Sequence, residues 1–166
     1  MESTRKRIFH TAIITLLCFA MAGCGQKSEK NIEQIDMKKL QETMLAADET
    51  LPKMQVSSSN DENADLNFSS LSDMDYSRIA SYFYAYAKSG TAQEIAVIQL
   101  KDPKDEAILM QSIQKHVDNR IKTLQEYNPE QVNMAKNAVI TRKSGYVTLI
   151  ISEKNGLVQN AFDSFF

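Results

Sequence analysis

Three tyrosines alternate along one strand-like segment and form the most suggestive candidate binding surface in the sequence. Tyr82, Tyr84 and Tyr86 are separated by Phe83 and Ala85. Residues two apart in a strand point to the same face and lie about 7 Å apart. If that face is open, the rings could bind a sugar, a peptide or a wall polymer. If helices cover it, the rings belong to the core or to a cross-strand packing ladder, which is the arrangement we favour.

Residues that could carry out catalysis are scarce. Of the two histidines, His10 lies in an N-terminal segment that we expect to be removed, and His116 lies beside Val117 at the edge of a predicted apolar stripe. A single histidine in such a place is typically a partly exposed structural residue. Without a second histidine or a thiol no catalytic triad can form, although Ser-Lys and carboxylate chemistry stay open. We therefore expect a protein that is not an enzyme.

The acidic residues do not form a metal site in the sequence pattern. Residues 73–77 begin like a calcium-binding loop, but Arg78 stands where that loop requires glycine and Tyr84 stands where it requires glutamate. The acidic stretch at residues 61–65 is typical of a solvated surface loop. We expect no metal and no cofactor.

The N-terminus has the features of a secretion signal. Three basic residues at 5–7 precede the apolar run 8–22, which contains no carboxylate. A membrane-spanning helix needs about 20 apolar residues, and this run is shorter. A charged region followed by a short apolar region is typical of a signal peptide.

The four residues that end this run are Met21, Ala22, Gly23 and Cys24. They resemble the lipobox of bacterial lipoproteins, which is usually Leu-Ala/Ser-Gly/Ala-Cys, with methionine in place of leucine. The resemblance implies cleavage after Gly23 and attachment of a diacylglyceryl group to Cys24, so residues 1–23 would be a lipoprotein signal peptide. Acyl chains such as palmitate would then anchor the protein in the cell membrane on the extracytoplasmic side, since each buried methylene contributes about 0.8 kcal/mol.

Cleavage at that position changes the charge and the thiol content. The whole chain has 19 basic and 21 acidic residues, and removing Glu2, Arg5, Lys6 and Arg7 takes the net charge from −2 to −4. An acidic domain has no electrostatic attraction for nucleic acid. Because both cysteines lie at or before the cleavage site, the mature domain has no free thiol, and its apolar core alone must hold it together.

The rest of the chain predicts a polar tether at residues 24–31 and a single domain at 32–166. Hydrophobic periodicity and turn signals predict each element, and Asp102 with Pro103 marks the start of the longest helix. We expect helices at 32–48, 102–124, 128–136 and 157–165, extended segments at 53–56, 79–86, 94–101, 138–142 and 146–151, and a polar loop at 57–65. The predicted fold class is α+β, an antiparallel sheet of four to five strands with helices packed on one face.

Residues from about 73 to 166 also resemble a family of small uncharacterised lipoproteins from Gram-positive, clostridial-type bacteria. The resemblance is carried by residues 94–97 before Lys101 and Asp102, the helix at 102–124, and the segments 127–130, 137–140 and 146–152. It implies a location at the membrane and a domain of unknown function, with no activity or site to transfer.

Three functions are consistent with these features. The leading hypothesis is a membrane-anchored binding or protein-interaction module whose partners are the membrane, through lipidated Cys24, and an unknown envelope protein or ligand. The alternative is a structural or assembly accessory of the cell envelope. An envelope hydrolase that uses carboxylates alone is the weakest of the three.

Overall fold

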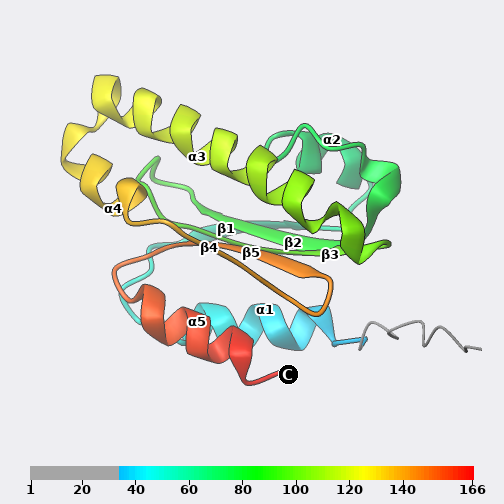
Figure 1. Ribbon diagram of the computed structural model, residues 1–166. Helices are drawn as coiled ribbons and strands as arrows, with labels where there is room; N and C mark the ends of the chain where they lie inside the picture. The colour runs from blue at the N-terminus through cyan, green and yellow to red at the C-terminus, as the bar shows by residue number, and fades with distance from the viewer. Residues whose placement is uncertain (1–33) are drawn as a thin grey trace, which may run out of the picture. The chain divides into compact units, whose positions relative to one another are not determined.

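The computed structural model describes residues 34–166, and residues 1–33 are drawn in grey in Figure 1. The predicted signal peptide, the lipobox with Cys24 and the tether at 24–31 therefore lie outside the described residues. The domain contains α1 (Met37–Ala46), β1 (Met54–Ser58), α2 (Ala64–Ser69), β2 (Ile79–Ala87), β3 (Glu94–Leu100), α3 (Glu106–Tyr127), α4 (Val132–Lys136), β4 (Val139–Lys143), β5 (Tyr146–Ile151) and α5 (Asn155–Asp163).

The five strands form one antiparallel sheet in the order β1-β2-β3-β5-β4. This arrangement confirms the predicted α+β class. The two hairpins, β2–β3 and β4–β5, meet through β3 and β5, and β1 adds an edge strand to β2. A two-residue turn joins β4 to β5, with Ser144 and Gly145 both at positive φ (51° and 83°), as the tight hairpin turns that match strand twist require.

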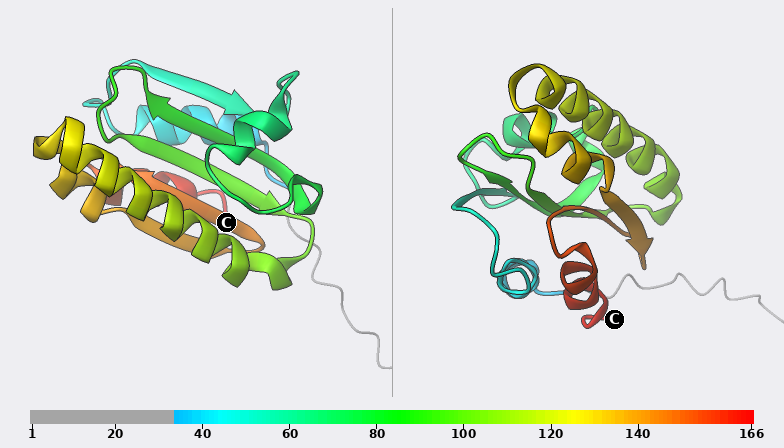
Figure 2. Two further views of the ribbon diagram at one scale, coloured as in Figure 1. Left: turned by 90° about the horizontal axis from the view of Figure 1, so that it is seen from above. Right: turned by 90° about the vertical axis from the view of Figure 1, so that its left-hand side faces the viewer.

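Helices cover both faces of the sheet, which corrects the expectation that they pack on one face only. In Figure 1, α2, α3 and α4 lie above the sheet and α1 and α5 lie below it, and the end-on view in Figure 2 shows the same three layers. The physical reason lies in the central strands. Every residue of β5, and every residue of β3 except Gln99, is buried. A strand that is apolar on both faces needs a covering layer on each side.

Each face has its own apolar core. On the face covered by α2, α3 and α4, here called the α3 face, Tyr84, Ile98 and Leu149 pack against Leu109 and Ile113 of α3. On the opposite face, side chains of the sheet pack against α1 and α5; they include Phe83, Ile95, Val97, Leu40, Met44, Val158 and Phe162. The period-two alternation of β2 therefore separates two cores.

The sequence predicted a helix from residue 102; the structure has a short turn at Pro103–Asp105, and α3 itself begins at Glu106 and ends at Tyr127. The carboxylate of Asp102 accepts a hydrogen bond from the backbone N–H of Lys104 at 3.0 Å, and Pro103 opens the short turn that leads into α3. The buried positions of α3 include Leu109, Ile113, Val117 and Leu124, spaced by four and seven residues. This stripe fixes the rotation of α3 about its own axis. Residues at the edge of the stripe therefore face the end of the sheet near the β2–β3 turn.

Helix α2 was not predicted: residues 57–65 were expected to form a loop, and no element was assigned to residues 66–72. The helix is short and presents Ala64 and Phe68 to the core. Phe68 is only 1% exposed, and its ring packs against Tyr76 and Tyr82 at centroid distances of 5.6 and 5.2 Å. With two buried residues in six, the segment is too short to show a helical period.

Candidate functional site

A cavity of about 490 Å³ opens beside the β2–β3 turn, under α3. Its wall combines residues from β2, from the turn, from the start of β3 and from the middle of α3. The aromatic and ionisable side chains of the wall are Tyr84, Tyr86, Lys88, Glu94, His116 and Arg120. The two tyrosines come from the alternating set that the sequence singled out.

Glu94 is the buried centre of this wall. It is the first residue of β3, only 2% exposed, and is paired in the ladders with Tyr86 of β2 and Ile151 of β5. One carboxylate oxygen lies 2.6 Å from His116 Nε2, and the other lies 3.1 Å from Arg120 Nε. His116 and Arg120 are four residues apart on α3 and so project from the same side of the helix.

Arg120 is held by a carbonyl as well as by the carboxylate. Its Nη2 donates a hydrogen bond to the backbone oxygen of Thr91 at 2.6 Å, which ties α3 to the β2–β3 turn. Its Nε is close enough to Glu94 to form an ion pair, but it is buried and has no partner in hydrogen-bond geometry among residues 34–166. The side chain as a whole is still 22% exposed and lines the cavity.

Tyr84 and Tyr86 form the aromatic part of the wall. Tyr84 is 5% exposed, and its ring stands perpendicular to the His116 ring at 6.0 Å. The rings of Tyr84 and Tyr86 lie 5.2 Å apart with an interplanar angle of 36°. Burial raises the pKa of Tyr84 well above its ordinary value, and the negative charge of Glu94 raises it further. Tyr84 therefore stays a neutral phenol beside the carboxylate.

The third tyrosine of the predicted set lies away from the cavity. Tyr82 is 1% exposed, and its hydroxyl donates to the backbone oxygen of Ala64 at 2.7 Å beneath α2. Burial raises the pKa of Tyr82 to about 12. The structure therefore divides the three tyrosines: Tyr82 and Tyr84 are covered by helices, and Tyr86 is half-buried at the cavity wall.

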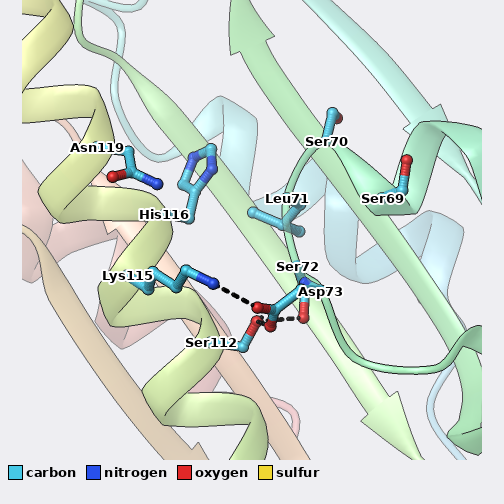
Figure 3. A pocket seen from close by; sticks show the side chains of 9 residues that line it. All are labelled: Ser69, Ser70, Leu71, Ser72, Asp73, Ser112, Lys115, His116 and Asn119. Carbon is cyan, nitrogen blue, oxygen red and sulfur yellow. Dashed lines mark hydrogen bonds and ion pairs between the residues drawn. The ribbon is translucent and has the colours of Figure 1, made fainter.

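A second, smaller cavity of about 170 Å³ lies on the other side of His116 (Figure 3). Here Ser112 Oγ and Lys115 Nζ both donate to the carboxylate of Asp73, at 2.5 and 2.7 Å, and the hydroxyls of Ser72 and Ser112 are 2.8 Å apart. Hydrogen bonds from Lys115 and Ser112 lower the pKa of Asp73. A carboxylate with a lowered pKa is a weak base, so Asp73 is poorly suited to activate Ser112 as a nucleophile. The cluster fastens the segment before β2 to α3.

Sequence reasoning missed Glu94 and Arg120. His116 was expected to be a partly exposed structural residue, and its side chain is 16% exposed, but it also contacts a buried carboxylate. The signal that could have indicated the site is a charged residue, Glu94, at the start of an otherwise apolar strand. A second signal is a basic residue four positions after the histidine on one helix.

The part of the chain that the structure describes has no cluster of three or more His, Cys, Asp or Glu side chains able to hold a metal ion. Within residues 34–166, no helix combines the length and the hydrophobicity needed to cross a bilayer. The arrangement around Glu94 can instead hold a polar group against aromatic rings.

Comparison with known proteins gives one match. Residues 53–152 match the family described as "Domain of unknown function (DUF4358)". No curated protein and no solved structure matches the chain. The matched region starts and ends earlier than the stretch from 73 to 166 on which the sequence resemblance rests. It spans β1 to β5 and includes the six cavity residues named above.

Proposed function

The chain belongs to the DUF4358 family of unknown function, and we propose that it is a membrane-anchored extracytoplasmic lipoprotein that binds a small ligand in the cavity between α3 and the β2–β3 turn. The observation that carries the binding role is the buried Glu94, which His116 and Arg120 hold at the wall of that cavity.

A buried ion cluster is a poor way to stabilise a small domain. Removing charges from water costs several kcal/mol each, and well-packed apolar residues often replace such a cluster without loss of stability. The remaining core of this domain is largely apolar, so the cluster is an exception that packing alone does not explain. A few fixed polar groups beside aromatic rings, in a cavity of a few hundred Å³, are typical of ligand-binding sites.

The location rests on the sequence. The basic residues at 5–7, the apolar run at 8–22 and the lipobox ending in Cys24 support export and lipid attachment. We propose no enzyme activity for the cavity beside the β2–β3 turn, because Glu94 is the only carboxylate among the described residues that line it, and a hydrolase that uses carboxylates alone needs a pair.

The binding role can be tested by photo-crosslinking in intact cells. A photoreactive phenylalanine analogue replaces Tyr86 at the cavity wall, and in a matched variant it replaces Tyr127, which is 82% exposed at the end of α3. We expect a small-molecule adduct of discrete mass at position 86 and none at position 127. Absence of an adduct at 86, or equal labelling at both positions, would contradict the proposal.

A further inference from the structure

We propose that the cavity recognises an anionic group, a carboxylate or a phosphate, through Arg120 and Lys88, and that a ring of the same ligand packs against Tyr86. This inference rests on the proposed binding function and adds the chemistry of the ligand. An acidic sugar has both features.

The first argument is the charge of the wall. Two of the lining residues, Lys88 and Arg120, carry a full positive charge, and within residues 34–166 Glu94 is the only lining residue with a negative one. The cavity is therefore positive before any charge on His116 is counted, although the whole chain has a net charge of −2. A concave positive site on an acidic protein concentrates anions locally.

Glu94 and Arg120 differ in the hydrogen-bonding groups that they still have available for a ligand. Both oxygens of Glu94 already face a cation or a ring nitrogen, so the carboxylate is poorly placed to receive a cationic ligand. Arg120 has five N–H donors. One at Nη2 binds Thr91 and the one at Nε is buried against Glu94 at 3.1 Å, so the remaining donors on the two Nη atoms have no hydrogen-bond acceptor among the described residues. An oxyanion would provide the acceptors that this guanidinium group lacks.

The third argument is the position of Lys88 relative to the aromatic wall. Lys88 is exposed at the start of the β2–β3 turn, two residues after Tyr86, and its ammonium group forms no hydrogen bond or ion pair within residues 34–166. Tyr86 is half-buried and supported from behind by Tyr84. A ligand held at its charged end by Lys88 and Arg120 would place its uncharged part on the Tyr86 ring, where ring faces can stack.

The test is a titration of the full-length chain in detergent, followed by NMR at the Arg120 Nε–H and at the Tyr86 amide. The probes are glucose 6-phosphate, glucuronate, inorganic phosphate and glucose. We expect saturable shifts with the first two probes, weaker saturable shifts with phosphate, and none with glucose. Raising the salt concentration should weaken the binding of all three anions.

Two pairs of variants separate the contributions. Lys88→Gln should weaken binding of glucose 6-phosphate at least fivefold, whereas Lys122→Gln, at an exposed position of α3 outside the cavity wall, should leave it unchanged. Tyr86→Leu should weaken binding of glucose 6-phosphate and of glucuronate but not of inorganic phosphate. Because Lys88 is exposed, its replacement should not disturb the fold.

The possible results distinguish this inference from the binding function on which it rests. If glucose shifts the same resonances as strongly as glucose 6-phosphate, or if Lys88→Gln and Lys122→Gln behave alike, the anionic preference is wrong. The same holds if no anion produces a saturable shift. In each case an adduct at position 86 would still support a binding function, and loss of that adduct as well would remove both proposals.

Discussion

At the scale of single residues, Glu94 determines how the candidate site is built. It occupies a sheet position at which the neighbouring β3 residues on the same face, Ala96 and Ile98, are apolar. A carboxylate there is stable only if cations and donors compensate for the water it loses. His116 and Arg120 provide this compensation from α3, so the ion cluster also connects the helix to the sheet.

We expect Glu94→Gln to lower the free energy of unfolding by about 3 kcal/mol, because it leaves Arg120 with no carboxylate in a largely buried position. Urea unfolding followed by circular dichroism would measure the change. Glu126→Gln is the matched control, since Glu126 is an exposed carboxylate on α3, the helix that carries Arg120; it should change stability by less than about 0.5 kcal/mol. Equal effects of the two substitutions would show that the cluster contributes nothing to stability.

The raised pKa of Tyr84 predicts how the free energy of unfolding falls at alkaline pH. Its pKa is raised in the folded state, first by burial and then by the negative charge of Glu94. Below about pH 10 the tyrosine is neutral in both the folded and the unfolded state, and the contribution of its burial to stability is complete. Above that pH the unfolded tyrosine ionises before the folded one, so the contribution is lost as the pH rises. Tyr84→Phe should therefore lose less stability than the wild type between pH 9 and 11. Parallel stability curves for the two proteins would contradict this.

At the scale of elements, the two helical layers have separate tasks. Helix α3 carries two residues of the cavity wall, His116 and Arg120, whereas α1 and α5 cover the opposite face and contact each other. On α5, Phe162 is fully buried, and Leu157 is 52% exposed. The lower layer therefore supports the sheet without contributing a side chain to the cavity.

Phe162→Ala should lower the free energy of unfolding by about 3 to 5 kcal/mol, because it leaves a cavity between α5 and the sheet. Leu157→Ala, on the same helix but exposed, should change it by less than about 0.5 kcal/mol. Both values can be measured by chemical denaturation. If the two variants were equally stable, α5 would not be packed as the structure shows.

The hydrogen bond between Ser152, which follows β5, and Asp48, which follows α1, predicts a loss of stability at acidic pH. Burial works to raise the pKa of Asp48, but hydrogen bonds from Ser152 and Thr50 outweigh it, and the pKa is lowered. A lowered pKa gives stability that is present above about pH 4, the range of an ordinary aspartate, and is lost as the pH falls further. The stability difference between wild type and Asp48→Asn should therefore shrink below pH 4. A difference that stays constant from pH 7 to pH 3 would contradict the assignment.

The elements that could be predicted from the sequence are those with local signals. The helix signal at Asp102 and Pro103 is set by neighbouring residues, and the hydrogen bond that Asp102 accepts from the backbone of the short turn before α3 confirms it. The covering of both sheet faces and the contact between Glu94 and His116, 22 residues apart, arise where a helix crosses a strand. Such contacts depend on how elements pack, which no local pattern encodes.

At the scale of the whole molecule, the proposed function requires the domain to remain at the membrane. The cavity residues all lie within residues 34–166, and the proposed attachment point, Cys24, lies outside the described residues. The polar segment between them predicts a short, hydrated tether. A single acyl chain gives only marginal membrane binding, so stable anchoring needs the two or more chains that a lipobox cysteine implies.

The anchor can be tested by intact-mass analysis of the protein from the membrane fraction. We expect the wild-type protein to lack residues 1–23 and to carry a lipid increment on Cys24, and we expect Cys24→Ala to show neither change. Cys18→Ala is the matched control, because Cys18 lies within the same N-terminal segment but outside the lipobox; it should be processed like the wild type. Recovery of the wild-type protein from the cytosol with Met1 present and Cys24 unmodified would remove the proposed location, while the ligand cavity could still be tested independently.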